Sequence, residues 1–308
     1  MSTPTEGTVV TNKEERPGLP AAHSLEHRMR RLSLALLAPG MVWYLVFLAA
    51  PMVVLVIYSL GRRAPNGGYE AALSLQQYGL LDTRWVPFLN TVRLGLAGTL
   101  LALLVAYPLA YFMATRGGRH KMVLLALVVI PFWTSFLIRT YAWVFLLGNR
   151  GIPQILERLG YPNVRLLNTS FAVLLGIVYN YLPLMVLPIY VSLERVDVNL
   201  RHASKDLGAG RWRTFIQVTL PLSAPGVVSG VLLVFVPVLG EYLIPVLLGG
   251  GQTYFLGNAL YDLFFQSRNW PFGAAVAVTF IILIMLLIAA YMWFTRKVVA
   301  EGREAPLL

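Results

Sequence analysis

The chain has 308 residues, of which 57% are hydrophobic and only 13% are charged. Soluble proteins carry about 25% charged residues, so this composition excludes an ordinary soluble domain and predicts an integral membrane protein. The net charge of +11 does not indicate nucleic-acid binding, because the basic residues gather in short loops between apolar runs. The chain has no cysteine, so it holds neither disulfides nor thiolate metal sites.

The chain divides by polarity into two tails and a membrane domain. Residues 1–31 are polar and are predicted to form a cytoplasmic tail. Arg28, Arg30 and Arg31 keep the start of the next segment on the cytoplasmic side of the membrane. The first apolar run starts too late and is too long for a cleaved signal peptide. Six long apolar runs follow one another along the chain, and each exceeds the roughly 20 residues that a spanning helix needs. We therefore predict an all-α membrane domain over residues 32–295, a C-terminal tail over 296–308, and six transmembrane helices at about 32–60, 88–115, 121–148, 170–193, 222–248 and 272–295.

The distribution of lysine and arginine predicts the orientation of these helices. With the N-terminus inside, the cytoplasmic segments hold 16 of these residues and the outer loops hold 7. Cytoplasmic loops of membrane proteins are enriched in basic residues, so we expect both termini in the cytoplasm. The segment 194–221 then faces the cytoplasm as well.

This segment is the one long charged interruption between apolar runs. Apolar residues recur in it at helical spacing, while Gly208 and Gly210 permit the backbone angles of a sharp corner. Pro221 is expected in the first turn of the next span, where its missing N–H is harmless. The pattern predicts two short helices with a glycine break. It fits an element that docks into a groove, although an ordinary basic cytoplasmic loop would share the pattern.

Ionisable residues inside apolar runs are the candidates for a transport path. Counted at 1.5 Å per residue, Arg139 and Glu241 each lie roughly 27 Å along a straight helix, and Arg93 begins the second span. A charged side chain at this depth pairs with an opposite charge, extends to the membrane interface or faces a water-filled cavity. The two residues thus form a salt bridge, or Glu241 faces a cavity and attracts a cation with help from aromatic rings. The predicted path residues are Glu241, Tyr242, Trp133, Arg139 and Tyr141.

Prolines inside most of the runs are consistent with the broken helices of transporters, although bilayer helices also tolerate proline. No Gly-Lys pair occurs, so the chain has no P-loop for a nucleotide. A metal-binding helix and a nucleophile elbow are also missing. We expect no catalytic residues, no cofactor and no metal, and any ATP must be hydrolysed by another chain.

The spacing of the 194–221 segment resembles the coupling-loop signature of membrane subunits of binding-protein-dependent ABC importers. That signature runs E-A-A, three residues, G, nine residues, I-x-L-P. The family's glutamate position is His202 here, so Asp206 or Glu194 is left to supply the acidic contact with an ATPase. The resemblance implies coupling to an ATPase through His202, Ala203, Ser204, Asp206, Gly208, Ala209, Leu220 and Pro221.

Three further stretches, Pro131–Tyr141, Tyr179–Tyr190 and Gly240–Gly250, look like the third, fourth and fifth spans of polyamine importer permeases. The resemblance implies a type I ABC importer permease in the bacterial inner membrane that moves putrescine or spermidine. The implied partners are a second, homologous permease, two cytoplasmic ATPase subunits and a periplasmic binding protein, all around the lipid bilayer.

The sequence leaves three alternative functions open. The same machine would carry an oxyanion, ferric iron, thiamine or a sugar if a different binding protein served it. An ATP-independent secondary transporter would need inverted repeats or a proton relay, and the chain offers one mid-span carboxylate. A membrane-anchored scaffold would not need proline-broken spans.

Overall fold

The computed structural model describes residue 33 and residues 35–251 and 253–304. The predicted tail 1–31 and residues 305–308 lie outside the described part. The chain divides into a short unit, Met1–Val54, and a long unit, Leu55–Leu308. Residues 35–54 of the short unit lie in a helix that runs over Ala35–Ser59 and contains a π-helical turn, η1 (Leu45–Ala49), followed by α2 (Ala50–Ser59). Its length and apolar composition confirm the first predicted span.

After the end of α2, the long unit forms a small hairpin and then becomes helical again. Strand β1 (Arg62–Arg63) pairs antiparallel with β2 (Tyr69–Glu70), with Arg62 opposite Glu70. The 3₁₀ segment η2 (Gln76–Arg84) leads directly into α3 (Trp85–Arg116), which contains the predicted run 88–115. Arg93 lies two turns inside this helix, so it does not begin the span as predicted.

The remaining elements follow in chain order. They are η3 (Gly118–His120), α4 (Lys121–Val129), η4 (Ile130–Trp133), α5 (Phe136–Leu147), α6 (Ile152–Arg158), α7 (Ser170–Glu194), α8 (Val198–Asp206), α9 (Arg211–Thr214), η5 (Phe215–Thr219), α10 (Leu220–Leu239), α11 (Leu243–Gly249), α12 (Leu256–Tyr261), η6 (Asp262–Gln266) and α13 (Trp270–Glu304).

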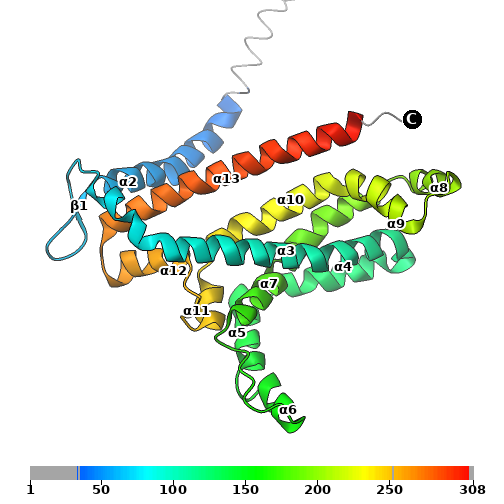
Figure 1. Ribbon diagram of the computed structural model, residues 1–308. Helices are drawn as coiled ribbons and strands as arrows, with labels where there is room; N and C mark the ends of the chain where they lie inside the picture. The colour runs from blue at the N-terminus through cyan, green and yellow to red at the C-terminus, as the bar shows by residue number, and fades with distance from the viewer. Residues whose placement is uncertain (1–32, 34, 252, 305–308) are drawn as a thin grey trace, which may run out of the picture. The chain divides into compact units, whose positions relative to one another are not determined.

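Helix α7 forms the centre of the core, with α3 and α10 packed along it (Figure 1). Small side chains allow this close approach, as is common between membrane helices. Ala102, Ala106 and Ala110 form a fully buried stripe along α3 at a spacing of four residues. Gly98 faces Ile177 of α7, where a Cβ added to the glycine would approach the Ile177 side chain to 2.7 Å. A larger residue there would push the two helices apart.

The third predicted span is not a straight helix. The segments Gly118–Trp133 and Phe136–Arg158 meet at an angle of 93°. Pro131 stands in the first turn of η4, and Thr134 then takes an extended conformation with φ −73° and ψ 154°. The chain therefore turns between Trp133 and Phe136, and the predicted depth of Arg139 along a single helix is wrong.

The fifth predicted span is also broken. Helix α10 ends at Leu239, the chain turns through Gly240 and Glu241, and α11 starts at Leu243. Glu241 thus lies in the link between two helices, so its predicted depth on a straight helix is wrong too.

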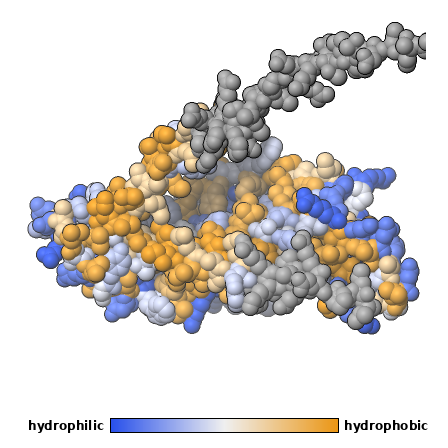
Figure 2. Space-filling model, turned by 90° about the horizontal axis from the view of Figure 1, so that it is seen from above, coloured by the Kyte–Doolittle hydropathy of each residue, from blue (hydrophilic) through white to orange (hydrophobic). Residues whose placement is uncertain are grey.

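The described residues contain five helices long and apolar enough to cross a membrane, and the bent pair supplies a sixth if it is one span. The last helix continues past the predicted boundary at residue 295, through the described part of the predicted C-terminal tail, as far as Glu304. Figure 2 shows hydrophobic surface over much of this face, with hydrophilic surface gathered toward the ends of the view. This pattern is that of a multi-pass integral membrane protein.

Candidate functional site

The coupling loop, residues 194–221, contains one predicted short helix, α8, and the predicted glycine break, whereas the second expected short helix is the start of the long helix Arg211–Leu239. Helix α8 ends in a Schellman motif, in which the N–H of Gly208 donates to Lys205 O at 2.9 Å and the N–H of Ala209 donates to Ser204 O at 3.1 Å. Gly208 occupies the left-handed position of the motif with φ +84°. Gly210 has φ −69°, an ordinary value. The corner expected from the glycines is confirmed, and Gly208 is the residue that makes it.

A side-chain contact connects the two helices of this corner. The hydroxyls of Ser204 on α8 and Thr214 on α9 are 3.1 Å apart, and Thr214 is buried. Asp197 caps α8 by accepting from the N–H of Asn199 at 2.9 Å. His202 and Asp206 stay exposed on the same helix. The corner is therefore held by its own contacts, while the polar side chains of His202 and Asp206 remain accessible to a partner.

Several large apolar side chains of the coupling loop are exposed. Leu207 is 89% exposed and Trp212 is 78% exposed, one on each side of the Gly208 corner. Ile216, one turn beyond Trp212, is more than half exposed. An exposed apolar group of this size on a polar loop indicates a surface for another protein.

Pro221 lies in the first turn of α10, as predicted, but the helix does not begin there. The helix is already under way at Arg211 and runs without a break to Leu239. Before the proline it widens into the π turn η5, in which the N–H of Leu220 donates to Phe215 O. Pro221 has no N–H to donate, so this wider turn lets the helix pass the proline without ending.

The second candidate site lies where the two broken spans meet α7. Glu241 is 8% exposed, and its Oε1 accepts from the backbone N–H groups of Tyr242, Leu243 and Ile244 at 3.0, 2.9 and 3.3 Å. Its Oε2 accepts from the hydroxyl of Tyr181 at 2.6 Å. The carboxylate thus caps α11 at the positive end of the helix and binds α7.

Arg139 does not form the salt bridge with Glu241 that was one of the two expectations. Among the described residues its guanidinium instead lies over aromatic rings, 5.2 Å from the centroid of Phe132 and 6.0 Å from that of Phe136. The side chain is 7% exposed, and its Nε has no hydrogen-bond partner within the described chain. Cation–π contacts across the bend between η4 and α5 therefore replace the expected ion pair.

The predicted aromatic residues stay accessible beside these breaks. Trp133 is 83% exposed, Tyr141 is 55% exposed, and Tyr242 is 37% exposed with its ring stacked on Tyr261 at 5.7 Å. Helix α11 packs against both α5 and α7, so the breaks after Trp133 and Leu239 lie on neighbouring elements. Tyr181 is not among the predicted site residues, although it stands among polar residues in the otherwise apolar fourth run.

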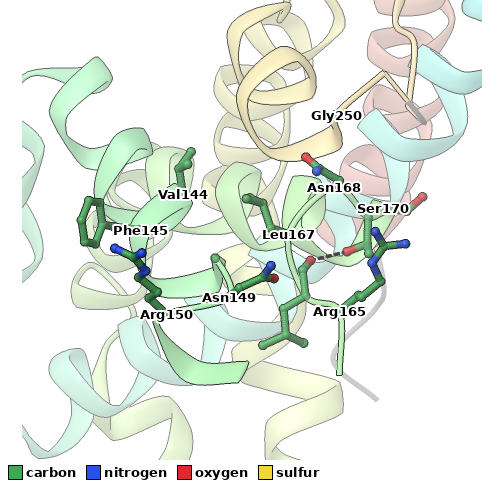
Figure 3. Close-up of a pocket in the computed structure, with 12 residues that line it drawn as sticks. Val144, Phe145, Asn149, Arg150, Arg165, Leu167, Asn168, Ser170 and Gly250 are labelled. Carbon is green, nitrogen blue, oxygen red and sulfur yellow. Dashed lines mark hydrogen bonds between the residues drawn. The ribbon is translucent and has the colours of Figure 1, made fainter. Parts of the chain in front are cut away.

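A polar pocket of about 940 Å³ lies between the C-terminal end of α5 and the N-terminal end of α7, and the coupling loop follows the other end of α7 (Figure 3). Arg150 and Arg165 stand on opposite sides of it, with Asn149 and Leu167 between them. The described residues that line the pocket include no acidic side chain. Asn168 and Gly250, both with positive φ, close its wall where a side chain on Gly250 would collide with Asn168.

Residues 106–300 match the family model described as "Binding-protein-dependent transport system inner membrane component". This segment covers the bent pair, α7, the coupling loop and both breaks. The chain belongs to this family.

Similar proteins of known bacteria support the assignment to this family. The spermidine/putrescine transport system permease protein PotB of Haemophilus influenzae is 36% identical over 254 residues, covering 81% of this chain and 89% of that protein. PotB of Escherichia coli K12 is 35% identical over 267 residues, covering 85% and 97%. The molybdenum transport system permease protein ModB of Escherichia coli K12 is 33% identical over 227 residues, covering 70% and 96%.

Two solved structures share the fold of this family member. A bacterial ABC transporter involved in the import of the acidic polysaccharide alginate matches with a TM-score of 0.68 and 19% identity, over 89% of this chain and 99% of that one. A bacterial alginate ABC transporter in complex with an alginate-pentasaccharide-bound periplasmic protein matches with a TM-score of 0.73 and 17% identity, over 89% and 97%. The predicted all-α, type I importer permease fold is confirmed.

Proposed function

We propose that this chain is the permease subunit of an ATP-driven importer that takes spermidine or putrescine from a periplasmic binding protein into the cytoplasm. The observation that carries the proposal is 35–36% identity to PotB proteins along 81–85% of the chain. The bacterial inner membrane is the corresponding location. A second, homologous permease completes the pathway, as the resemblance implies.

The coupling loop is the contact through which this permease responds to ATP. Two cytoplasmic ATPase subunits bind and hydrolyse the nucleotide, and one of them receives Leu207 and Trp212 in an apolar groove. The exposure of these two side chains supports this role, since burial of apolar area drives such docking. Because the helix of Trp212 continues into α10 as far as Leu239, a displacement of the docked loop tilts α10 as a unit.

The transport path runs beside the two breaks. The exposed rings of Trp133, Tyr141 and Tyr242 supply faces that attract an ammonium group. Glu241 and Arg139 are buried beside the breaks and hold them in shape through contacts with Tyr181, Phe132 and Phe136. A polyamine would thus pass along aromatic faces rather than bind a free carboxylate.

The pocket with Arg150 and Arg165 is the contact for the binding protein. It lies at the opposite ends of the spans from the coupling loop, which is the outer side when the loop is cytoplasmic. Its charge repels a cationic polyamine, so the occupant is an acidic group of a protein rather than the cargo. Charge complementarity of this kind orients a docking partner and speeds its association.

Uptake of radiolabelled spermidine and putrescine tests the proposal. Cells that lack the chain are compared with cells complemented by the wild type or by Gly208→Val, and labelled molybdate is the control solute. We expect complementation to restore polyamine uptake alone, and Gly208→Val to restore less of it. If complementation restores molybdate uptake instead, the importer assignment stands and the polyamine is wrong. If the chain copurifies with no ATPase, the importer assignment itself fails.

A further inference from the structure

A second cavity lies beneath the coupling loop, on the side that faces the membrane helices. It measures about 390 Å³ and is bounded by the last turns of α3, by α8 and by the stretch α9–η5. On α8 its lining residues are Val198, Arg201, His202 and Lys205, whose spacing places them on one stripe of the helix. Leu207 and Trp212 do not line it, so the cavity and the exposed apolar groups belong to different faces.

The cavity carries a strong positive charge. Arg116, Arg201, Lys205 and Arg211 line it together with His202, and no acidic residue is among the described lining residues. The glutamate of the family signature would place a carboxylate at the position of His202. Its replacement by histidine leaves the wall free of negative charge. A cationic cargo is repelled here, and the ligand that fits is an anion.

A buried hydroxyl in the wall supplies a hydrogen-bond donor for that anion. Thr219 is 1% exposed, lines the cavity, and its Oγ1 has no partner within the described chain. Other helical threonines donate to the carbonyl four residues before them, as Thr99 does to Gly95 and Thr115 does to Tyr111. For Thr219 that carbonyl belongs to Phe215, which instead accepts from the N–H of Leu220 in the π turn. A buried donor without a partner is costly, and a phosphate oxygen would satisfy it.

We propose that this cavity binds the phosphate of an anionic lipid headgroup at the membrane surface. Arginine and lysine are the side chains that bind phosphate most effectively, and basic pockets between membrane helices on the cytoplasmic side suit lipid headgroups. The cavity is lined by the last turn of α3, where that span leaves the membrane. Phe112 in the same turn is 47% exposed, so an acyl chain can lie along it while the headgroup enters the cavity.

A lipid in this position would connect the end of α3 with α8 and so brace the coupling loop from the membrane side. The site needs only the chain's own residues. Only the effect of the lipid on transport rests on the proposed function. Lipid binding is therefore measured on the purified full chain, without cargo or ATP, so that a failure of the polyamine assignment leaves this test unaffected.

The experiment titrates the detergent-purified full chain with palmitoyl-oleoyl phosphatidylglycerol, with the matching phosphatidylcholine and with inorganic phosphate as competitor. Native mass spectrometry counts the retained lipids. The wild type is expected to retain one phosphatidylglycerol in preference to phosphatidylcholine. Arg201→Gln combined with Lys205→Gln should weaken this binding about thirtyfold, because two basic residues near the headgroup are lost. The matched control, Arg195→Gln with Arg213→Gln, removes the same charge from the same loop outside the cavity and should change the affinity little.

Thr219→Val separates a ligand site from a structural role. Valine keeps the shape and removes an unpaired hydroxyl, so the lipid-free variant should be at least as stable as the wild type, while its phosphatidylglycerol binding falls about fivefold.

Equal losses of lipid binding in the cavity and control variants would overturn the site, and equal retention of phosphatidylcholine would overturn the anionic headgroup. Displacement by equimolar inorganic phosphate would assign the cavity to the free ion. Release of the lipid on adding an ATPase subunit would assign it to that protein instead.

Discussion

The hydroxyl of Tyr181 donates a 2.6 Å hydrogen bond to Oε2 of Glu241, across 60 residues of sequence. The other carboxylate oxygen accepts from three N–H groups at the start of α11. A single side chain therefore joins α7, at the centre of the core, to the link between α10 and α11. The negative charge of Glu241 is used within the chain, which explains how a carboxylate is stable inside an apolar span.

This relationship predicts that Tyr181→Phe and Glu241→Gln both destabilise the protein. Tyr181→Phe leaves a buried carboxylate oxygen unpaired, and the loss of a hydrogen bond to a charged group should lower the free energy of unfolding by about 1–3 kcal/mol. The double variant should cost less than the sum, because both changes remove the same contact. Thermal unfolding of the purified chain measures this, with Tyr179→Phe as the control on the same helix. Normal stability of Glu241→Gln with a raised KM for spermidine would instead indicate that the carboxylate contacts cargo.

Gly208 should be needed for its backbone angle alone. A Cβ at this position would meet nothing within 4 Å, so the only obstacle to a side chain is φ +84°. Gly208→Val should cost about 1–2 kcal/mol in the corner and reduce uptake more than ATP hydrolysis. Gly208→Asn should keep most of the coupling, because asparagine tolerates left-handed angles.

Gly210→Ala is the matched control, since Gly210 has an ordinary φ and equally open surroundings. Uptake and ATPase activity of the reconstituted complex are measured side by side for all three variants. Equal activity of Gly208→Val and Gly210→Ala would contradict the role of the corner.

The sequence predicted the spans and the coupling corner because both depend on local chemistry. Apolar runs mark helices that cross a bilayer, and Gly208 marks the place where α8 must end. The positions of the breaks were missed because the predicted runs 121–148 and 222–248 stay apolar enough overall to be taken as single spans. Proline alone does not locate them either, since Pro183 and Pro188 lie within the unbroken α7, whereas the chain breaks three residues after Pro131 and Pro237.

The side-chain partners in the candidate sites could not be predicted from the sequence for a different reason. Tyr181 meets Glu241, and Arg139 meets Phe132, only after two spans have bent and packed against α7. The basic cavity beneath the coupling loop likewise combines Arg116, from the end of α3, with residues about 90 positions later. Contacts of this kind depend on the tertiary structure, which periodicity and spacing do not encode.

The exposed apolar groups of the coupling loop should carry much of the ATPase contact. Leu207→Asp or Trp212→Asp places a charge where a partner's apolar groove would close, which costs binding without disturbing the core. We expect each variant to reduce copurification of the ATPase subunits at least about tenfold, with normal membrane levels of the chain. Leu73, which is 94% exposed before η2, provides the control Leu73→Asp. Full copurification of both coupling-loop variants would show that the ATPase binds elsewhere.

The arginine pocket of Figure 3 should govern association with the periplasmic binding protein. Arg150→Glu combined with Arg165→Glu replaces attraction by repulsion for an acidic docking group, so the association rate should fall by about tenfold or more at low ionic strength. The wild-type rate should itself fall as salt is added, because exposed charges are screened over roughly 10 Å at 0.1 M. Surface plasmon resonance with the immobilised transporter measures both effects.

Arg158→Glu combined with Arg62→Glu is the matched control for this variant. Both arginines lie in predicted outer loops, and neither lines the pocket. The control changes the net charge by the same amount, so it isolates the position of the charge from its sum. If both double variants slow association equally, the binding protein responds to the overall field of the outer face. A loss confined to Arg150 and Arg165 places its acidic group in the pocket between α5 and α7.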